Sequence, residues 1–284
     1  MRVLRVLSLV MACAVAVVVL VPVAWTISVS LKPPREWVAH PPHLIPEEPT
    51  IANYQVLFQI GNPVGAVAEM TRTAEPVTRA FVNSLIIAPI ATVLSVAIGF
   101  LAAYAVARFR VGGALLPFNA LLTRMFPPVA FAVPLLVYYR MLGLIDTRFG
   151  LGLMYTGFTV AFSLWMIRGF IEAVPRHVEE AAILDGAGRW RVLLTITLPL
   201  VKGGVAAAML FIFILNWTEF LFALIFTSRH AITLPVQVSH YAGAVGRFYG
   251  PQAALGVVAS LPVVLAGYLI QRHLVRAFTF GLVK

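Results

Sequence analysis

The sequence predicts an all-α integral membrane protein with six transmembrane helices. Hydrophobic residues make up 61% of the 284 positions and charged residues only 11%, whereas a soluble domain has about 25% charged residues. The mean hydropathy is +0.93, which leaves too little polar surface to cover a soluble protein of this size. The spanning segments must be helices, because lipid offers the backbone no hydrogen-bond partners.

Six apolar segments have the length of about 20 residues that a helix needs to cross a bilayer. They cover residues 7–29, 81–107, 115–141, 150–171, 204–226 and 253–274. Three of them contain an internal proline, at Pro89, Pro134 and Pro262. Inside a helix bundle we expect these prolines to kink the helices rather than to end them.

The predicted organisation has three parts. Residues 1–30 hold a short tail and the first helix, residues 31–79 form a proline-rich segment outside the cytoplasm, and residues 80–284 hold the other five helices. The prolines before Thr50 exclude a long helix in the early part of the second segment. A long polar loop at residues 172–203 interrupts the third.

The N-terminal apolar run extends past Cys13 to about Val29, which is longer than the core of about 7–15 residues in a removable signal peptide. Cys13 is the single cysteine, which excludes a disulfide framework and a cysteine-based metal site. The net charge is +10, but the cations are scattered at the ends of apolar segments. This distribution favours contact with anionic headgroups and argues against nucleic-acid binding.

The distribution of Lys and Arg also predicts the orientation in the membrane. With the N-terminus in the cytoplasm, twelve of them lie at the inner ends of the spans and eight at the outer ends. Because cytoplasmic loops carry an excess of these residues, we expect both termini and the loop at 172–203 to lie in the cytoplasm.

The loop at residues 172–203 reads as two short helices joined by a sharp bend. Pro175 suits the first position of a helix, and Gly186 suits its end because glycine adopts the left-handed conformation at low cost. A second helix is expected from about Arg189, with Pro199 limiting its extension. Small, apolar and acidic groups on the water side suggest a docking element. The alternative is an amphipathic connector that lies on the membrane.

The same loop carries a recognisable motif: "EAA" at residues 180–182, "DGA" at 185–187 and "LP" at 198–199. This pattern resembles the EAA loop of ABC-importer permeases, which inserts a coupling helix into a cleft of a separate cytoplasmic ATPase. The resemblance implies that Glu180 accepts a basic residue of the ATPase and that Gly186 sets the bend. The residues implied in ATPase coupling are Glu179, Glu180, Ala181, Ala182, Asp185, Gly186, Ala187 and Pro199.

Further stretches resemble the carbohydrate-uptake branch of that family, in particular the second permease of maltose-type importers. They are "ISVSLKPPREW" from residue 27, "NSLIIAPIATVLSVAIGFLAAYAVARFR" from 83, "RMFPPVAFAVPL" from 124 and "QRHLVRAFTFGLVK" at the C-terminus. The sequence departs from the family pattern at Leu193, where Phe is frequent, and at Gly203, near which Pro is frequent. Residues 62–77 match nothing in that pattern.

The resemblance implies the permease fold of type I ABC importers and transport by alternating access. It also implies a heterodimer with a second homologous permease, two copies of an ABC ATPase, an extracytoplasmic solute-binding protein and surrounding membrane lipids. ATP and Mg²⁺ would bind to the ATPase, because this sequence has no G-x-x-x-x-G-K-[ST] motif. It has neither HExxH nor clustered Cys or His, so we expect no metal site, no cofactor and no enzyme activity of its own.

Polar and aromatic residues within the predicted spans are candidates for cargo contact. Ionisable groups inside a membrane are costly and usually face a bundle interior or a wet cavity, and aromatic rings can stack on sugars. The candidate translocation path comprises Asn119, Arg124, Tyr138, Tyr155, Asn216, Trp217 and Glu219, with Trp165 as a further aromatic. We expect Asn216 and Glu219 to share a face near the middle of the fifth span. The alternative for all of them is packing or interhelical hydrogen bonding without cargo contact.

Together these features predict the permease subunit of an ATP-driven importer of a di- or oligosaccharide or a related glycoside. Within the same family the cargo could instead be glycerol phosphate, a polyol or another non-sugar solute such as a peptide, an amino acid or a metal. Two rivals belong to other classes: an ion-coupled secondary transporter with Glu219 as its coupling acid, and a membrane assembly or sensor protein that transports nothing. The first leaves the EAA loop unexplained, and the second predicts no cargo flux in reconstituted vesicles.

Overall fold

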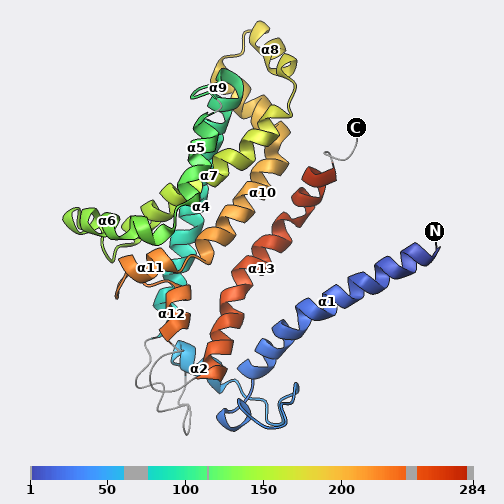
Figure 1. Cartoon of the computed structure of the whole chain (residues 1–284), viewed down its shortest axis with the longest axis vertical. Coiled ribbons are helices and arrows are strands. Elements are labelled where there is room, and N and C mark those ends of the chain that lie inside the picture. The colour runs from blue at the N-terminus through green and yellow to red at the C-terminus, as the bar shows by residue number, and fades with distance from the viewer. Residues whose placement is uncertain (1, 61–75, 114, 241–247, 280–284) are drawn as a thin grey trace. The chain divides into compact units, whose positions relative to one another are not determined.

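The computed structural model consists of helices joined by turns and loops (Figure 1). It describes residues 2–60, 76–113, 115–240 and 248–279, and no strand occurs among them. Two compact units form, one from Met1–Phe81 with Val236–Leu261 and the other from Val82–Pro235 with Pro262–Lys284. In chain order the elements are α1 (Arg2–Ser30), η1 (Pro34–Glu36), α2 (Ala52–Phe58), α4 (Val77–Phe109), α5 (Leu115–Met125), α6 (Pro128–Met141), α7 (Arg148–Glu172), α8 (Arg176–Leu184), α9 (Arg189–Val192), η2 (Leu193–Thr197), α10 (Leu198–Trp217), α11 (Leu221–Phe226), α12 (Leu234–His240) and α13 (Tyr249–Thr279).

Five helices in the described part of the chain are long and apolar enough to cross a membrane. They are Val6–Ser30 within α1, Val77–Phe109, Arg148–Glu172, Arg189–Trp217 and Tyr249–Gln271 within α13. The predictions of the first, second, fourth and sixth spans are confirmed. Helices α5 and α6 make a sixth span if they are counted together, although the pair is bent by 84°.

The third predicted span, 115–141, is therefore broken rather than continuous. The break lies between Met125 and Pro128. Pro127 and Pro128 have no N–H to donate to the preceding turn, and the residue before a proline is disfavoured in a helix. Pro128 then occupies the first turn of α6, where a proline is tolerated.

The fifth predicted span, 204–226, differs from the structure at both ends. The helix begins at Arg189, runs through η2 and α10, and ends at Trp217. The sequence predicts that Pro199 limits the extension of the loop helix. This prediction is wrong, because the helix continues through Pro199. In the π-helical turn η2 the N–H of Leu198 donates to the carbonyl of Leu193, five residues earlier. This wider turn accommodates Pro199, which lacks a donor and would otherwise clash with the preceding turn.

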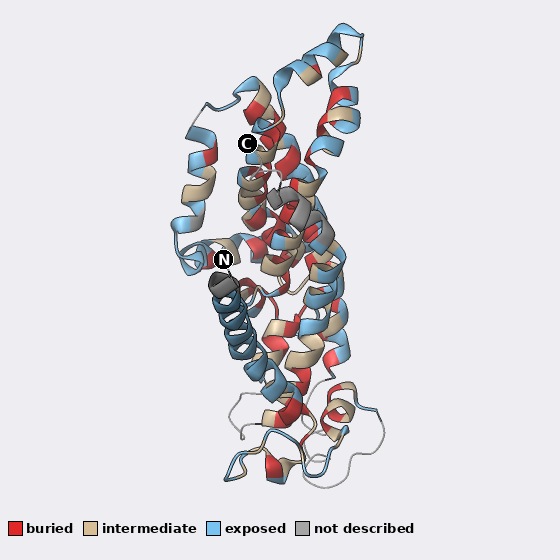
Figure 2. Cartoon of the chain, turned by 90° about the vertical axis from the view of Figure 1, so that its right-hand side faces the viewer, coloured by how far each residue is buried: buried red, intermediate tan, exposed pale blue. Residues whose placement is uncertain are grey.

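Helices α4, α7 and α10 form the core of the second unit, and their contact depends on small residues. A Cβ atom on Gly99 of α4 would lie 2.4 Å from Oγ of Ser163 on α7, and one on Gly204 of α10 would lie 2.1 Å from the ring of Phe170. Such close approach compensates for the missing hydrophobic driving force between helices in lipid. The buried residues of this cluster include Val96, Phe100, Ala103, Ile167, Ile171, Ala208 and Ile212 (Figure 2).

Helix α1 has the opposite character, because its apolar side chains are exposed along most of its length (Figure 2). The most apolar window of its candidate span is 0% buried within the chain. An apolar surface of this size is stable only where lipid or another subunit covers it. The burial pattern therefore agrees with a membrane-spanning helix.

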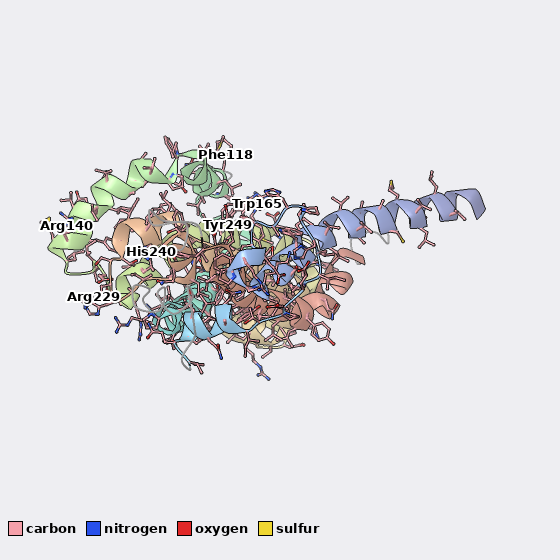
Figure 3. All side chains as sticks on the ribbon, turned by 90° about the horizontal axis from the view of Figure 1, so that it is seen from below. Phe118, Arg140, Trp165, Arg229, His240 and Tyr249 are labelled. Carbon is pink, nitrogen blue, oxygen red and sulfur yellow. The ribbon has the colours of Figure 1, made fainter. Side chains whose placement is uncertain are left out.

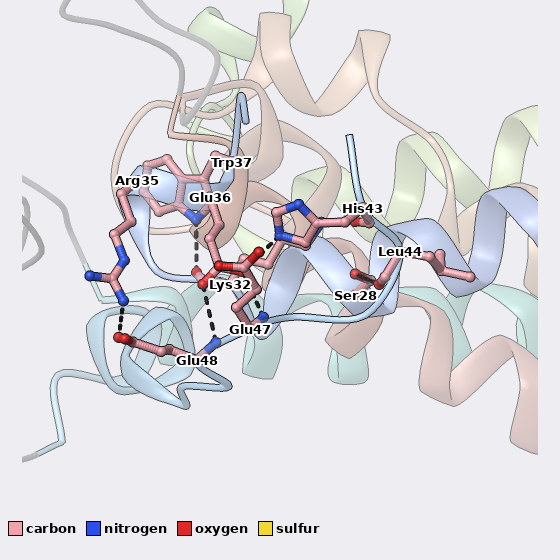
Figure 4. Close-up of polar contacts among 9 residues, drawn as sticks. All are labelled: Ser28, Lys32, Arg35, Glu36, Trp37, His43, Leu44, Glu47 and Glu48. Carbon is pink, nitrogen blue, oxygen red and sulfur yellow. Dashed lines mark hydrogen bonds and ion pairs between the residues drawn. The ribbon is translucent and has the colours of Figure 1, made fainter. Parts of the chain in front are cut away.

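In the first unit the proline-rich segment is held around Glu36 (Figure 4). The Glu36 side chain accepts the N–H groups of Glu47 at 3.0 Å and Glu48 at 3.2 Å and lies 3.1 Å from Nε2 of His43. Burial raises the pKa of Glu36, but the hydrogen bonds from His43 and from these two amides outweigh burial and leave the pKa below its ordinary value. One buried carboxylate thus organises a segment that has little regular structure.

Asn53 of α2 fastens this segment to the end of α1. It is fully buried, and its Nδ2 donates to the carbonyls of Ser30 and Lys32, both at 2.9 Å. Only the three-residue η1 precedes Thr50 after α1, so the prediction of no long helix there is confirmed. Residues 62–77, which match no family pattern, lie almost wholly outside the described residues.

Asp146, between α6 and α7, holds the loop that follows α11. Its carboxylate accepts the N–H groups of Ser228, Arg229, His230 and Ala231 at 2.9–3.2 Å. Burial raises the pKa of Asp146, but these four backbone donors outweigh it and lower the pKa from 3.8 to about 2. The carboxylate acts as a clamp for four consecutive amides.

Asn83 of α4 holds the far end of the same loop. Its Nδ2 donates to the carbonyls of His230 at 2.9 Å and Ile232 at 2.8 Å, while its Oδ1 accepts from Nε of Arg148 at 2.7 Å. Asn83 is completely buried. The loop is therefore fixed to α4 by Asn83 and to the turn before α7 by Asp146, two polar side chains from distant parts of the sequence.

We expect Asp146→Asn to loosen this loop. A neutral amide has one acceptor oxygen, and hydrogen bonds to a charged acceptor are worth about 1 kcal/mol more than neutral ones, so the amides at 228–231 should exchange about fivefold faster in hydrogen-exchange mass spectrometry. Because the folded pKa of Asp146 lies below 3.8, this protection is complete above about pH 4 and is lost as the pH falls toward 2. The exposed Asp185→Asn variant is the control, and unchanged exchange in Asp146→Asn would refute the clamp.

Candidate functional site

The loop at residues 172–203 forms a helical hairpin at one end of the second unit (Figure 1). Helix α8 begins at Arg176, so Pro175 is its N-cap. The prediction that Pro175 is the first helical residue is therefore wrong by one position. Gly186 has a φ of +84°. The N–H of Gly186 donates to Ile183 and that of Ala187 to Ala182, the two bonds of a Schellman ending. The predictions that Gly186 ends the first helix and that the second begins at Arg189 are confirmed.

The outer side of this hairpin presents acids beside large apolar side chains. Glu180 and Asp185 are exposed. Leu184, which lies between them in the sequence, is 89% exposed, and Trp190, which follows them, is 68% exposed. Ala181, Gly186 and Pro199 are also exposed, whereas Ala182 and Ala187 are partly buried. Exposed apolar side chains rimmed by charge are typical of a surface that binds another protein.

Glu179 differs from its neighbour Glu180 because it points into the protein. It is 5% exposed. Its Oε2 lies 2.9 Å from Nε of Arg108 and its Oε1 accepts the hydroxyl of Thr197 at 2.8 Å. Tyr104 donates to the same carboxylate at 3.4 Å. Of the residues predicted for ATPase coupling, Glu179 therefore cannot touch a partner directly, and we assign it the anchoring of α8.

The anchor joins three separate parts of the chain. Arg108 belongs to the last turn of α4, Glu179 to α8 and Thr197 to η2. Arg108 also donates through Nη2 to the carbonyl of Val174 at 3.0 Å, and Arg176 donates to the carbonyl of Ala107 at 3.1 Å. We call Arg108, Glu179, Thr197 and Tyr104 the anchor cluster. Both hairpin helices are thus fixed to the ends of membrane spans.

Sequence reasoning missed three members of the anchor cluster. From the sequence, Arg108 is counted only among the positive charges at the inner ends of the spans, Thr197 is placed on one side of the second loop helix without a partner, and Tyr104 is given no role. A weak signal existed, because Tyr104 and Arg108 lie four residues apart and so share a face at the end of a span. Their partner, however, lies more than 70 residues further along the chain, which no local pattern indicates.

The structure brings two of the predicted path residues, Tyr155 and Glu219, together. The hydroxyl of Tyr155 donates to the backbone carbonyl of Glu219 at 3.4 Å. The Glu219 carboxylate accepts the N–H groups of Phe222 at 3.1 Å and Ala223 at 3.3 Å. Glu219 lies in the break between α10 and α11, not near the middle of a continuous span as predicted, and it caps the start of α11.

Asn216 does not share a face with Glu219, because the helix ends between them at Trp217. Its Nδ2 donates to Oγ1 of Thr92 on α4 at 3.1 Å, and its Oδ1 has no partner among the described residues. Trp217 is 3% exposed, and its ring lies 5.6 Å from that of Phe213. Asn216 thus joins α10 to α4, whereas the ring contact of Trp217 lies within α10. A role of either residue in transport stays a prediction.

The remaining path candidates are not gathered at one place. Asn119 on α5 and Tyr138 on α6 are exposed, as is Trp165 on α7 (Figure 3). Arg124 lies in α5, but its side chain is outside the described residues. Tyr139, rather than Tyr138, faces a largely apolar cavity of about 440 Å³ between α5, α6 and α7.

We expect the anchor cluster to dominate the stability of the hairpin. Glu179→Met or Arg108→Met alone leaves a buried charge without its partner, which costs about 3–5 kcal/mol, so the thermal unfolding temperature in detergent should fall in both. The double variant removes both charges and should unfold at a higher temperature than either single variant. Arg168→Met is the control, because it breaks the exposed pair with Glu172 and should cost about 0.5 kcal/mol or less. A double variant less stable than both singles would argue against the pair.

Comparison with known proteins places these features in a family. Residues 95–280 match the family model described as the binding-protein-dependent transport system inner membrane component. A putative ABC transporter permease of Streptomyces antibioticus is 37% identical over 84% of this chain and 100% of its own length. The trehalose/maltose transport system permease protein MalG of Thermococcus litoralis is 32% identical over 99% of this chain and 97% of its own.

A solved structure shares the fold. It is a bacterial ABC transporter involved in the import of the acidic polysaccharide alginate, with a TM-score of 0.70, 21% identity and coverage of 95% of this chain and 96% of that one. The predicted permease fold is confirmed. The match of the family model to residues 95–280, together with relatives aligned over 84% and 99% of the chain, shows that this multi-pass membrane protein belongs to the family of inner membrane components of binding-protein-dependent transport systems.

Proposed function

We propose that this chain is the permease subunit of an ATP-driven importer of a di- or oligosaccharide or a related glycoside. The observation that carries the proposal is the hairpin α8–α9, which exposes the EAA motif at Glu180 while Glu179 is anchored inside. The similarity to a trehalose/maltose permease over 99% of the chain supports a carbohydrate cargo. Glycerol phosphate, a polyol or another non-sugar solute is the alternative.

The geometry suggests how a movement of the ATPase would be passed to the membrane spans. The exposed side of the hairpin, with Glu180, Asp185 and Leu184, would bind in a cleft of a cytoplasmic ATPase, where Glu180 accepts a basic residue. The anchor cluster then ties α8 to α4 through Arg108 and to α10 through Thr197. A displacement of the hairpin would move the ends of two spans together, because a buried ion pair resists separation.

The remaining parts of the importer follow from this assignment. A second, homologous permease would complete the membrane cavity, and two ATPase copies would bind ATP and Mg²⁺ beneath the pair. A solute-binding protein would deliver the cargo from outside, and both termini would lie in the cytoplasm. This chain would bind no cofactor and catalyse no reaction itself.

An ion-coupled mechanism finds less support. A coupling acid must gain and lose a proton during transport, whereas the carboxylate of Glu219 accepts two backbone amides of α11. Protonation would weaken the cap of that helix. The contacts of Glu219 therefore favour a structural role over proton or sodium coupling.

The first test is purification of the tagged chain from its native membrane, with identification of the co-purified proteins and an ATPase assay in proteoliposomes. We expect a second permease and a P-loop ATPase, with hydrolysis stimulated by a binding protein loaded with one glycoside from a panel that also contains glycerol phosphate and polyols. Stimulation by one of those other solutes would replace the sugar as cargo. Elution without any ATPase, with uptake sensitive to uncouplers, would overturn the proposal.

Glu180→Lys should abolish uptake while the chain still inserts into the membrane, because a positive charge would face the basic partner expected on the ATPase. Uptake should fall at least tenfold in proteoliposomes, and the ATP hydrolysed per solute transported should rise. Glu47→Lys gives the same charge change at an exposed position outside the hairpin and should transport normally. An uptake rate in Glu180→Lys equal to that of the wild type would refute the coupling role of Glu180.

A further inference from the structure

A cavity of about 500 Å³ lies beside the hairpin, where α4 and α7 end. Its volume is in the range of about 300–1,000 Å³ found for small-molecule pockets. Because Phe109 and Glu172 are the last residues of two candidate spans, the cavity lies at the boundary between membrane and water. The charged residues in its lining are Arg108, Arg110, Arg168, Arg176 and Glu172.

The positive charges in this cavity exceed the negative charges near them. Arg108 pairs with Glu179 and Arg168 with Glu172. Among the described residues, no carboxylate lies within ion-pair distance of Arg110 or Arg176. The C-termini of α4 and α7 contribute about half a negative charge each. The two carboxylates and the two helix C-termini together offset about three of the four arginine charges, so about one positive charge in the cavity stays unbalanced.

The backbone beside the arginines leaves room for a ligand. Arg110 has a φ of 54°, and Gly112 and Gly113 follow with φ values of 71° and 59°, so the chain turns sharply away from the end of α4. Gly113 lines the cavity, and a Cβ atom there would meet nothing within 4 Å. Pro175, which also lines it, caps α8 without a side-chain hydrogen bond. The first turn of α8 thus adds its own positive end.

We propose that this cavity binds the phosphodiester headgroup of an anionic phospholipid. Guanidinium groups match phosphate oxygens in geometry and charge, and basic pockets between spans at the cytoplasmic surface bind such headgroups. The single negative charge of a phosphodiester offsets most of the unbalanced positive charge of the cavity, to which the arginines contribute about one charge and the first turn of α8 about half a charge. Its position at the ends of two spans favours a lipid over a soluble phosphate. The proposal does not depend on the cargo of the importer.

A headgroup at this place would bear on coupling, because Arg108 belongs both to the cavity and to the anchor cluster. The phosphate would lie beside the guanidinium that holds Glu179. The membrane lipids would then contribute to the fixation of the hairpin, and the ATPase activity of the complex should depend on the anionic lipid content.

The test measures lipid binding to the purified importer complex by native mass spectrometry, with phosphatidylglycerol and phosphatidylcholine of identical acyl chains as probes. The wild type should prefer phosphatidylglycerol. Arg110→Gln with Arg168→Gln should weaken its binding about 25-fold, from about fivefold for each basic residue near the membrane, and leave phosphatidylcholine binding unchanged. Arg140→Gln, at an exposed arginine on α6 (Figure 3), should bind like the wild type.

A second variant changes the binding in the opposite direction. Glu172→Gln removes the carboxylate of the lining and releases Arg168, so phosphatidylglycerol should bind more tightly than to the wild type. A loss of fold cannot produce such a gain, which keeps the proposal testable if the double arginine variant fails to assemble.

Three results would overturn the proposal. The first is equal phosphatidylglycerol binding by the wild type, the double variant and Glu172→Gln. The second is displacement of the lipid by an equal concentration of inorganic phosphate, which would make the cavity a site for soluble anions. The third is loss of the ATPase from the double variant in lipid-free detergent with lipid binding unchanged, which would make it a protein interface. Since lipid binding is measured without transport, the result stands apart from that of the uptake assays.

Discussion

The buried ion pair between Arg108 and Glu179 is the interaction on which the position of the hairpin α8–α9 depends. Both side chains are only 7% exposed and lie 2.9 Å apart, and two charges in such a place are stable only when they are paired and hydrogen-bonded. Thr197 and the carbonyl of Val174 supply those bonds. Because the partners come from α4, α8 and η2, the pair fixes the position of the hairpin relative to two spans. The exposed Glu180 and Leu184 can then meet a partner as part of a rigid element.

The spans themselves are held by close contact rather than by hydrophobic burial, since lipid is as apolar as their side chains. Gly99 and Gly204 let α4 and α10 approach α7 more closely than any larger residue would. The π turn η2 belongs to the same scheme, because it carries Pro199 within a helix that continues from the hairpin into the membrane. Helix α9 and the span α10 therefore belong to one continuous helix.

Two spans are interrupted, and polar side chains bind backbone groups at the interruption between α10 and α11 and in the loop that follows α11. The break between α10 and α11 lets Glu219 cap a new helix, and the two prolines after Met125 separate α5 from α6. Asp146 and Asn83 hold the loop after α11 from opposite ends. Glu219, Asp146 and Asn83 thus satisfy backbone groups that regular helical hydrogen bonds leave open, and such groups must find partners inside a membrane protein.

The sequence by itself determined the class of the protein, four of the six spans and the bend of the hairpin, because these depend on local composition and on the conformation of Gly186. The EAA motif indicated the family for the same reason. Only the tertiary structure decided which of two adjacent acids points inward, since Glu179 is selected by Arg108, 71 residues away. It likewise decided that Tyr139 rather than Tyr138 lines a cavity and that Glu219 caps a helix. A sequence pattern does not distinguish two adjacent residues of the same type, because their roles are set by partners that are distant in the chain.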